Sequence, residues 1–99
     1  MRLSAAETAV IKDVVRATAG AGAQVRLFGS RLDDGARGGD IELLVDTDEP
    51  VEHALLLGAR IAAGIELALG EQRIDVVLGA PNLAEQAIHA VARRSGRLL

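Results

Sequence analysis

The sequence contains no cysteine, tyrosine or tryptophan, only two prolines, and a single aromatic residue, Phe28. Without cysteine the chain has no disulfide, no thiolate nucleophile and no cysteine-ligated zinc site, which fits the reducing cytoplasm. Without aromatic side chains it lacks the platforms on which bases stack, and this argues against most proteins that bind single-stranded nucleic acid. The core must therefore be built from Leu, Ile, Val and Ala.

Long apolar runs and an excess of positive charge are also missing. Arg60 and Glu66 interrupt the longest apolar stretch, so no segment is expected to span a bilayer, and residues 1–4 do not have the pattern of a signal peptide. The formal net charge of -3 disfavours a general polyanion-binding surface. We expect a cytoplasmic protein with no membrane segment and no direct, stable binding to nucleic acid.

Composition and length predict one globular domain over residues 1–99. Hydrophobic residues make up 49% of the chain and charged residues 25%, which is enough to bury one core but leaves no room for a second. Acidic residues gather between Asp33 and Glu52, where eight acids accompany a single cation, Arg37. A divalent cation is a more natural ligand there than a nucleic-acid backbone, although solvated loop charge would give the same composition.

Capping signals and apolar periodicity predict three main helices. Ser4 and Glu7 have the spacing of a capping box and begin a helix over 5–19, whose inward face is Leu3, Val10, Ile11, Val14 and Val15. The acids before Pro50 predict the start of a helix over 50–69. Pro81 predicts a last helix over 81–94, ended by Gly96, with an inward face of Leu83, Ala87, Ile88 and Val91.

Alternating apolar residues predict strands over 24–28, 40–46 and 73–78, with a short helical turn and a loop between 31 and 39. The resulting order is αβ(α)βαβα. It describes an α/β (α+β) domain in which helices cover a small mixed sheet of about three to four strands.

Three acidic residues lie on the predicted strands. Asp40 and Glu42 are two positions apart and therefore share one strand face, and Asp75 can join them if the strands 40–46 and 73–78 are neighbours. Three adjacent carboxylates repel one another, and a pair of Mg²⁺ ions relieves that repulsion while clamping the oxygens in phosphoryl or nucleotidyl transfer. A solvated strand face is the simpler explanation for each acid alone, and Asp46 is expected to be a surface acid at the strand end.

The strand over 24–28 runs directly into a Gly-Ser turn. Gly29 lets the backbone approach a ligand closely, and Ser30 offers a hydroxyl and an amide to phosphate oxygens. Arg31 and Arg37 could neutralise a triphosphate or the pyrophosphate leaving group. Taken alone, each of these features is more often an ordinary turn or a surface charge.

The two histidines offer little to such a site. His53 and His89 lack a second histidine or a cysteine at ligand spacing. Metal binding by either of them is therefore not expected.

Taken together, these features resemble a known signature. A strand, Gly29-Ser30, nine residues and then Asp40-Ile41-Glu42 is similar to the signature of nucleotidyltransferases with the DNA polymerase β-type fold. Residues 25–31, 35–37 and 40–42 look like the minimal nucleotidyltransferases, the MNT family of MntA-like antitoxins. Residues 73–77 and 80–99 resemble that family's third-carboxylate strand and last helix, so the resemblance covers nearly the whole chain. Glu42 stands where the family often has Asp, and one extra methylene can shift a bound metal.

The resemblance implies a nucleotidyltransferase that uses ATP as substrate and Mg²⁺, with two ions, as cofactor. Many MNT proteins are encoded beside a HEPN-domain RNase toxin and act as its antitoxin, some by transferring AMP to a toxin tyrosine. Carried over to this sequence, Gly29 and Ser30 bind the triphosphate, Asp40 and Glu42 bind the metal ions, and Asp75 is the third metal-linked carboxylate, placed to activate an acceptor hydroxyl. The chain itself has no tyrosine, so a tyrosine acceptor belongs to another molecule.

Two other functions stay open from the sequence. The chain could neutralise its partner by contact, with a nucleotide site that is weak or inactive, or it could be a subunit of an antibiotic-type small-molecule nucleotidyltransferase. Helix 50–69 carries more Leu and Ile than one core-facing stripe requires, which favours a surface for a homo- or hetero-oligomer, with complete burial as the alternative. Retention of all three carboxylates favours an enzyme.

Overall fold

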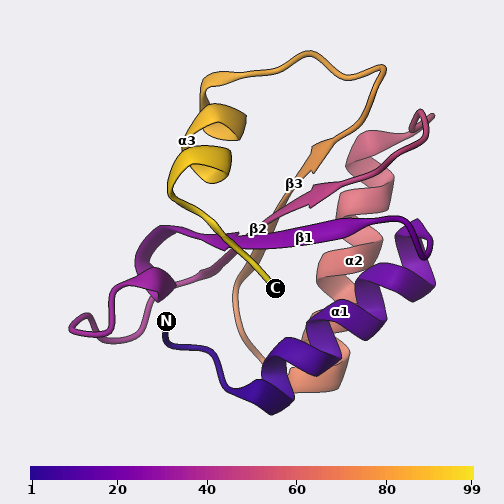
Figure 1. Cartoon of the computed structure of the whole chain (residues 1–99). Helices are drawn as coiled ribbons and strands as arrows, with labels where there is room; N and C mark the ends of the chain where they lie inside the picture. Colours follow the sequence, from indigo (N-terminus) through magenta and orange to yellow (C-terminus); the bar gives the residue numbers. More distant parts are fainter.

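A four-stranded sheet lies at the centre of the molecule, and different helices cover its two faces. The computed structural model describes all residues, 1–99. In chain order the elements are α1 (Ala5–Ala19), β1 (Gln24–Phe28), the short 3₁₀ turn η1 (Gly29–Leu32), β2 (Ile41–Asp46), α2 (Ala54–Leu69), β3 (Ile74–Gly79), α3 (Ala87–Ser95) and β4 (Arg97–Leu98). Helices α1 and α2 lie together on one side of the sheet and α3 lies on the other (Figure 1).

The sheet is mixed, and its strand order is β3-β2-β1-β4. Strand β1 runs antiparallel to both β2 and β4, whereas β2 and β3 are parallel. The predicted small mixed α/β sheet is therefore confirmed. The register places Phe28 opposite Glu42 and Glu42 opposite Asp75, so the end of β1 and the starts of β2 and β3 meet at one end of the sheet.

Two apolar clusters hold the layers together. The larger one fills the space between α1, α2 and one sheet face, and it contains Leu3, Ile11, Val15, Val25, Leu27, Ile41, Leu43, Val45, Ile61, Ile65 and Leu78. The smaller one joins Phe28 and Leu44 on the other sheet face to Ala92 of α3. Neighbouring residues of one strand thus belong to different clusters, because successive side chains of a strand point to opposite faces of the sheet.

The capping box predicted at the start of α1 is present. The Ser4 hydroxyl accepts a hydrogen bond from the Glu7 amide, and the Glu7 carboxylate accepts one from the Ser4 amide, both at 3.0 Å. These bonds satisfy two backbone donors that the first turn of a helix leaves without partners. No helix of the structure is both long enough and apolar enough to cross a membrane.

Helix α2 begins at Ala54 rather than at residue 50, so the predicted start was wrong. The reason is a contact from a distant segment. The Asn82 side chain accepts a hydrogen bond from the Val51 amide at 2.9 Å and donates one to the Val51 carbonyl at 2.8 Å. Because both backbone groups of Val51 are bound in this way, the segment before α2 stays irregular.

Helix α3 begins at Ala87, six residues after the predicted start, and buries a different face. Gln86 and His89 form its cap: the His89 Nδ1 accepts from the Gln86 amide at 3.0 Å, while Nε2 lies 2.8 Å from the Leu78 carbonyl. His89 and Ala92 are buried, whereas Ile88 and Val91, predicted to point inward, are partly exposed. The inward position of α3 is thus occupied by a histidine, whose two ring nitrogens each have a backbone hydrogen-bond partner, and not by the expected aliphatic residue.

Two further features of this side of the sheet differ from expectation. Strand β4, which pairs Arg97 and Leu98 with β1, was not predicted. Asp46, predicted to be a surface acid, has a side chain only 21% exposed and accepts hydrogen bonds from Arg26 at 3.2 Å and from both terminal nitrogens of Arg93 at 2.6 and 2.8 Å. The hydrogen bonds to Asp46, and to a lesser extent those to Glu85, raise the pKa of Arg93. The hydrogen bond from Arg93 lowers the pKa of Glu85. This network fastens α3 to β2.

Asp46→Asn is expected to lower the free energy of unfolding by about 1.5 to 3 kcal/mol, the usual range for a hydrogen bond that involves charged groups. The asparagine side chain has a single oxygen, so it cannot offer a separate oxygen to each of the two Arg93 nitrogens as the carboxylate does. Urea unfolding would measure the loss. Asp48→Asn, at an exposed position with no hydrogen bond from its side chain, provides the control, and equal stability of the two variants would contradict a structural role for Asp46.

Candidate active site

The backbone brings the three predicted carboxylates to one end of the sheet. Asp40 immediately precedes β2, Glu42 is the second residue of β2 and Asp75 is the second residue of β3. Strands β2 and β3 are neighbours, and Glu42 and Asp75 are register partners in this parallel pair, so their side chains leave the same sheet face. The adjacency of these strands, on which the proposed carboxylate group depends, is confirmed.

Arg73 is the counter-ion of two of these acids, and its sequence position alone did not reveal this role. Its Nε lies 3.5 Å from Asp40 and 3.8 Å from Asp75, whose side chains are 46% and 48% exposed. These distances also show that Asp40 and Asp75 approach one common point. Three carboxylates and one guanidinium leave an excess of negative charge at this end of the sheet.

The carboxylates suit Mg²⁺ by their chemistry, since this ion prefers oxygen ligands. Their side chains are not gathered into a ligand set, however: no three His, Cys, Asp or Glu side chains lie close enough together to hold an ion. Asp40 and Asp75 turn toward Arg73. The group therefore suits Mg²⁺ in the chemistry of its oxygens and in strand position, while its side chains do not form a ligand set in this structure.

Gly29 is the point at which β1 approaches Glu42. Its φ of +82° lies in the region that L side chains rarely adopt, and it begins the turn η1. A Cβ at this position would lie 2.7 Å from the Glu42 Cδ, and closer still to one carboxylate oxygen. The absence of a side chain at Gly29 therefore makes room for the Glu42 carboxylate against the turn.

Ser30 lies beside the other end of the loop that leads to β2. A Cβ on Gly39, whose φ is +89°, would lie 3.3 Å from the Ser30 Cβ and in collision with its hydroxyl. Gly39 immediately precedes Asp40. The Ser30 hydroxyl, predicted to bind phosphate, therefore lies against Gly39, the residue before the predicted metal ligand Asp40, although nine residues separate Ser30 from Asp40 in the sequence.

The two predicted triphosphate-binding arginines have different surroundings. Arg31 donates to the Gly39 carbonyl and the Arg2 carbonyl, each at 3.1 Å, and to the Gln72 side chain at 3.2 Å. Arg37 is exposed and makes no side-chain hydrogen bond or ion pair. Arg31 therefore has a structural task in this arrangement, and Arg37 is the one of the two whose guanidinium is available to a ligand.

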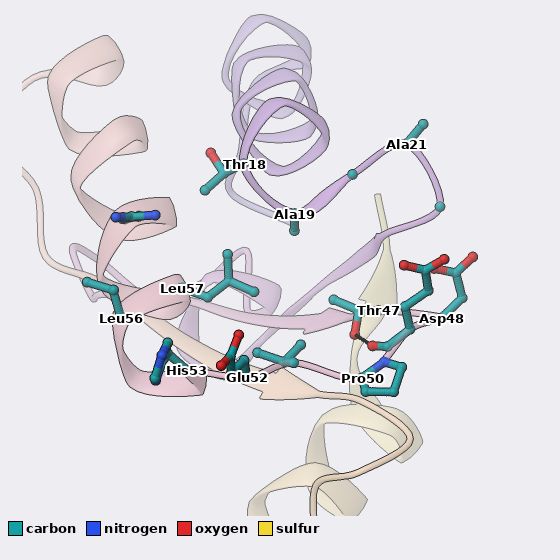
Figure 2. Close-up of a pocket in the computed structure, with 15 residues that line it drawn as sticks. Thr18, Ala19, Ala21, Thr47, Asp48, Pro50, Glu52, His53, Leu56 and Leu57 are labelled. Atoms are coloured by element: carbon teal, nitrogen blue, oxygen red, sulfur yellow. Dashed lines mark hydrogen bonds between the residues drawn. The ribbon is translucent and has the colours of Figure 1, made fainter.

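One pocket lies away from the three carboxylates. Its volume is about 480 Å³, and it is formed by the end of α1, the loop after β2 and the first turns of α2. Figure 2 shows Thr47, Asp48, Glu52 and His53 around it, with the Thr47 hydroxyl donating to the Glu49 carbonyl at 2.8 Å. The pocket contains none of the predicted site residues. Thr47 comes directly after the last residue of β2, whereas Glu42 lies at the beginning of that strand.

No family model and no curated protein sequence matches the chain. Among solved structures, a chain from the crystal structure of the toxin-antitoxin MntA-HpeT is similar, with a TM-score of 0.65 over 93% of this chain and 70% of that chain, at 20% identity. That structure is of a mutant in which two aspartates, two positions apart, are replaced by glutamate. This chain therefore shares its fold with a chain of MntA-HpeT. At the level of the fold, this confirms the likeness to MntA-like MNT proteins that the residues around Gly29-Ser30 indicated.

Proposed function

We propose that this chain is a Mg²⁺-dependent nucleotidyltransferase that transfers AMP from ATP to a hydroxyl of a partner protein, and that it acts in the cytoplasm as the antitoxin of a HEPN RNase toxin. The observation that carries the proposal is the pairing of Glu42 with Asp75 across neighbouring strands, with Asp40 beside them and the Gly29-Ser30 turn against them. The fold that the chain shares with a chain of a toxin-antitoxin complex supports the antitoxin role.

Each residue of the site has a distinct task in this reaction. Asp40, Glu42 and Asp75 would hold Mg²⁺, which when bound neutralises the triphosphate and clamps its oxygens. Ser30 binds phosphate oxygens, and Arg37 lends positive charge to the pyrophosphate that leaves. The acceptor oxygen forms a bond to the α-phosphorus as the bond from that phosphorus to the bridging oxygen of pyrophosphate breaks. Asp75, on the edge strand β3, takes the hydroxyl proton.

In this proposal the acceptor hydroxyl belongs to another molecule. The 99 residues form one small domain with the carboxylates at its surface, and the chain has no tyrosine to modify. A partner bound at this end of the sheet would exclude water from the carboxylates and strengthen their electrostatic interactions. The domain alone therefore supplies the nucleotide half of the site and its partner supplies the other half.

Incubation with α-³²P-labelled ATP, Mg²⁺ and the protein encoded by the neighbouring gene is expected to place label on that protein. Addition of excess EDTA should abolish labelling, and renewed Mg²⁺ should restore it, because the carboxylates repel the triphosphate without the ion. γ-³²P-labelled ATP provides the matched control: it should leave no label, since the γ-phosphate departs in pyrophosphate. Label from the γ position would identify a kinase and contradict the proposal.

Contact without catalysis is the second candidate, and one observation favours it. Leu55 and Leu67 of α2 are 93% and 88% exposed, so the alternative that helix 50–69 is fully buried was wrong. Exposed leucines of this kind are suited to a partner surface. A stable complex that inhibits the toxin, forms without ATP, leaves no label and weakens in Leu55→Asn or Leu67→Asn would establish this function instead.

A further inference from the structure

Arg2 connects the N-terminal segment to the loop between the Gly-Ser turn and β2. Its guanidinium donates to the Ser30 carbonyl at 2.9 Å, the Asp33 carbonyl at 2.7 Å and the Gly38 carbonyl at 2.6 Å. Its backbone amide donates to the Arg31 carbonyl at 2.7 Å. One side chain thus gathers backbone oxygens from the start, the middle and the end of residues 30–39, which we call the Ser30–Gly39 loop. Figure 1 shows the N-terminus beside this loop.

Arg31 completes the arrangement in the opposite direction. It donates to the Arg2 carbonyl, and its Nε binds the Gly39 carbonyl directly before Asp40. Its remaining contact, to Gln72, reaches the segment that leads to Arg73 and Asp75. The two arginines therefore connect the Gly29-Ser30 turn with the backbone that begins β2 and with the segment before β3.

Few other contacts hold the loop: the Met1 amino group pairs with Asp34, and the Gly35 amide donates to the Asp33 side chain at 2.9 Å. Residues 33–39 are almost all exposed and include three glycines, two of which, Gly38 and Gly39, have positive φ. Its own backbone bonds are two, from the Asp33 amide to Ser30 at 3.0 Å and from the Ala36 amide to Asp33 at 3.3 Å. Glycine-rich backbone loses more conformational freedom on ordering than any other, so the arginine contacts are expected to narrow the range of shapes that the loop adopts.

We propose that Arg2 is a positioning residue: together with Arg31 it fixes the distance between the Ser30 hydroxyl and Asp40, and so prearranges the nucleotide site. This inference rests on the proposed nucleotidyl transfer. Arg2 does not touch the carboxylates, and its bonds go to carbonyl oxygens of the loop. A fixed guanidinium fork matches three carbonyls better than an ammonium does.

Amide hydrogen exchange and Mg²⁺-ATP binding on the untagged chain test this proposal. In Arg2→Ala the Asp33 and Ala36 amides should exchange at least about tenfold faster, since each lost hydrogen bond is worth roughly a factor of two to ten in an equilibrium constant. Amides of β1 and β2 should keep their rates. Affinity for Mg²⁺-ATP should fall by about the same factor, with an unfolding temperature close to that of the wild type.

Two variants make the result specific. Arg2→Lys should recover part of the affinity and part of the amide protection. Arg16→Ala removes an exposed arginine of α1 that makes no side-chain hydrogen bond or ion pair, and it should behave as wild type. Equal affinity of Arg2→Ala and wild type would overturn the positioning role while leaving nucleotide binding established. A wild-type chain that binds no Mg²⁺-ATP would overturn both proposals.

Discussion

Asp75→Asn and Asp40→Asn are each expected to reduce transfer of label to the partner by about 10²- to 10³-fold, the usual effect of removing one group that stabilises the charge of a transition state. Both carboxylates approach Arg73, and Asp75 is the register partner of Glu42. Loss of either carboxylate therefore removes one of the three proposed metal ligands. An asparagine keeps the shape of the side chain but carries no charge and binds Mg²⁺ more weakly.

The same substitutions should leave the chain folded. Both side chains are about half exposed, and their ion pairs with Arg73 are long, at 3.5 and 3.8 Å. Exposed pairs of this kind contribute about 0 to 1 kcal/mol, and removal of one of three like charges also relieves repulsion. Urea unfolding should therefore show a change below about 1 kcal/mol, and Asp13→Asn, an exposed acid of α1 without side-chain partners, should change neither property.

The two measurements together distinguish the candidate functions. Loss of labelling with unchanged stability and unchanged binding to the partner establishes chemistry at the carboxylates. If both asparagine variants label the partner at the wild-type rate, the three acids are a solvated strand face, which is the simpler explanation of their spacing. If neither variant nor the wild type leaves label and all three neutralise the toxin, the chain acts by contact.

Short-range patterns were sufficient to place the candidate carboxylates on strands, whereas the adjacency of β2 and β3 came from the structure. The capping box at Ser4 and Glu7 is a local event, and it fixed the start of α1 correctly. Alternation placed Glu42 and Asp75 on corresponding faces of their strands, and the register then made them neighbours. The residues that resemble the nucleotidyltransferase signature are close together in the sequence around β2, so Asp40 and Glu42 could be predicted from the sequence alone.

Contacts between distant segments account for what the sequence did not predict. Asn82 delays the start of α2 by binding Val51, and no local pattern connects these residues. His89 faces the sheet because the Leu78 carbonyl accepts its bond, which reverses the apolar face expected for α3. Arg2 has its three partners between 28 and 36 positions further along the chain. In each case a polar side chain binds a remote backbone group, and hydrophobic periodicity carries no trace of such a bond.

Gly29→Ala should cause the second large effect, because it combines a backbone cost with displacement of a site residue. At a φ of +82° an L side chain costs about 1 to 2 kcal/mol, which corresponds to a fall in unfolding temperature of roughly 4 to 8 °C per kcal/mol in a domain of this size. The new Cβ also overlaps the Glu42 carboxylate. The end of a glutamate can rotate away at little cost in stability, but the carboxylate then leaves its position.

Gly20→Ala separates these two costs. Gly20 has a φ of +100° and nothing within 4 Å of its virtual Cβ, and it lies at the other end of the sheet. Both variants should lose a similar amount of stability, measured by thermal unfolding. Only Gly29→Ala should also lose transfer activity, by about 10²-fold, the effect that a displacement of about 1 Å can have on a reacting group. If the two variants lose the same small amount of activity below their unfolding temperatures, the contact between Gly29 and Glu42 has no part in the reaction, and Asp40 and Asp75 would have to bind the ion without a contribution from Glu42.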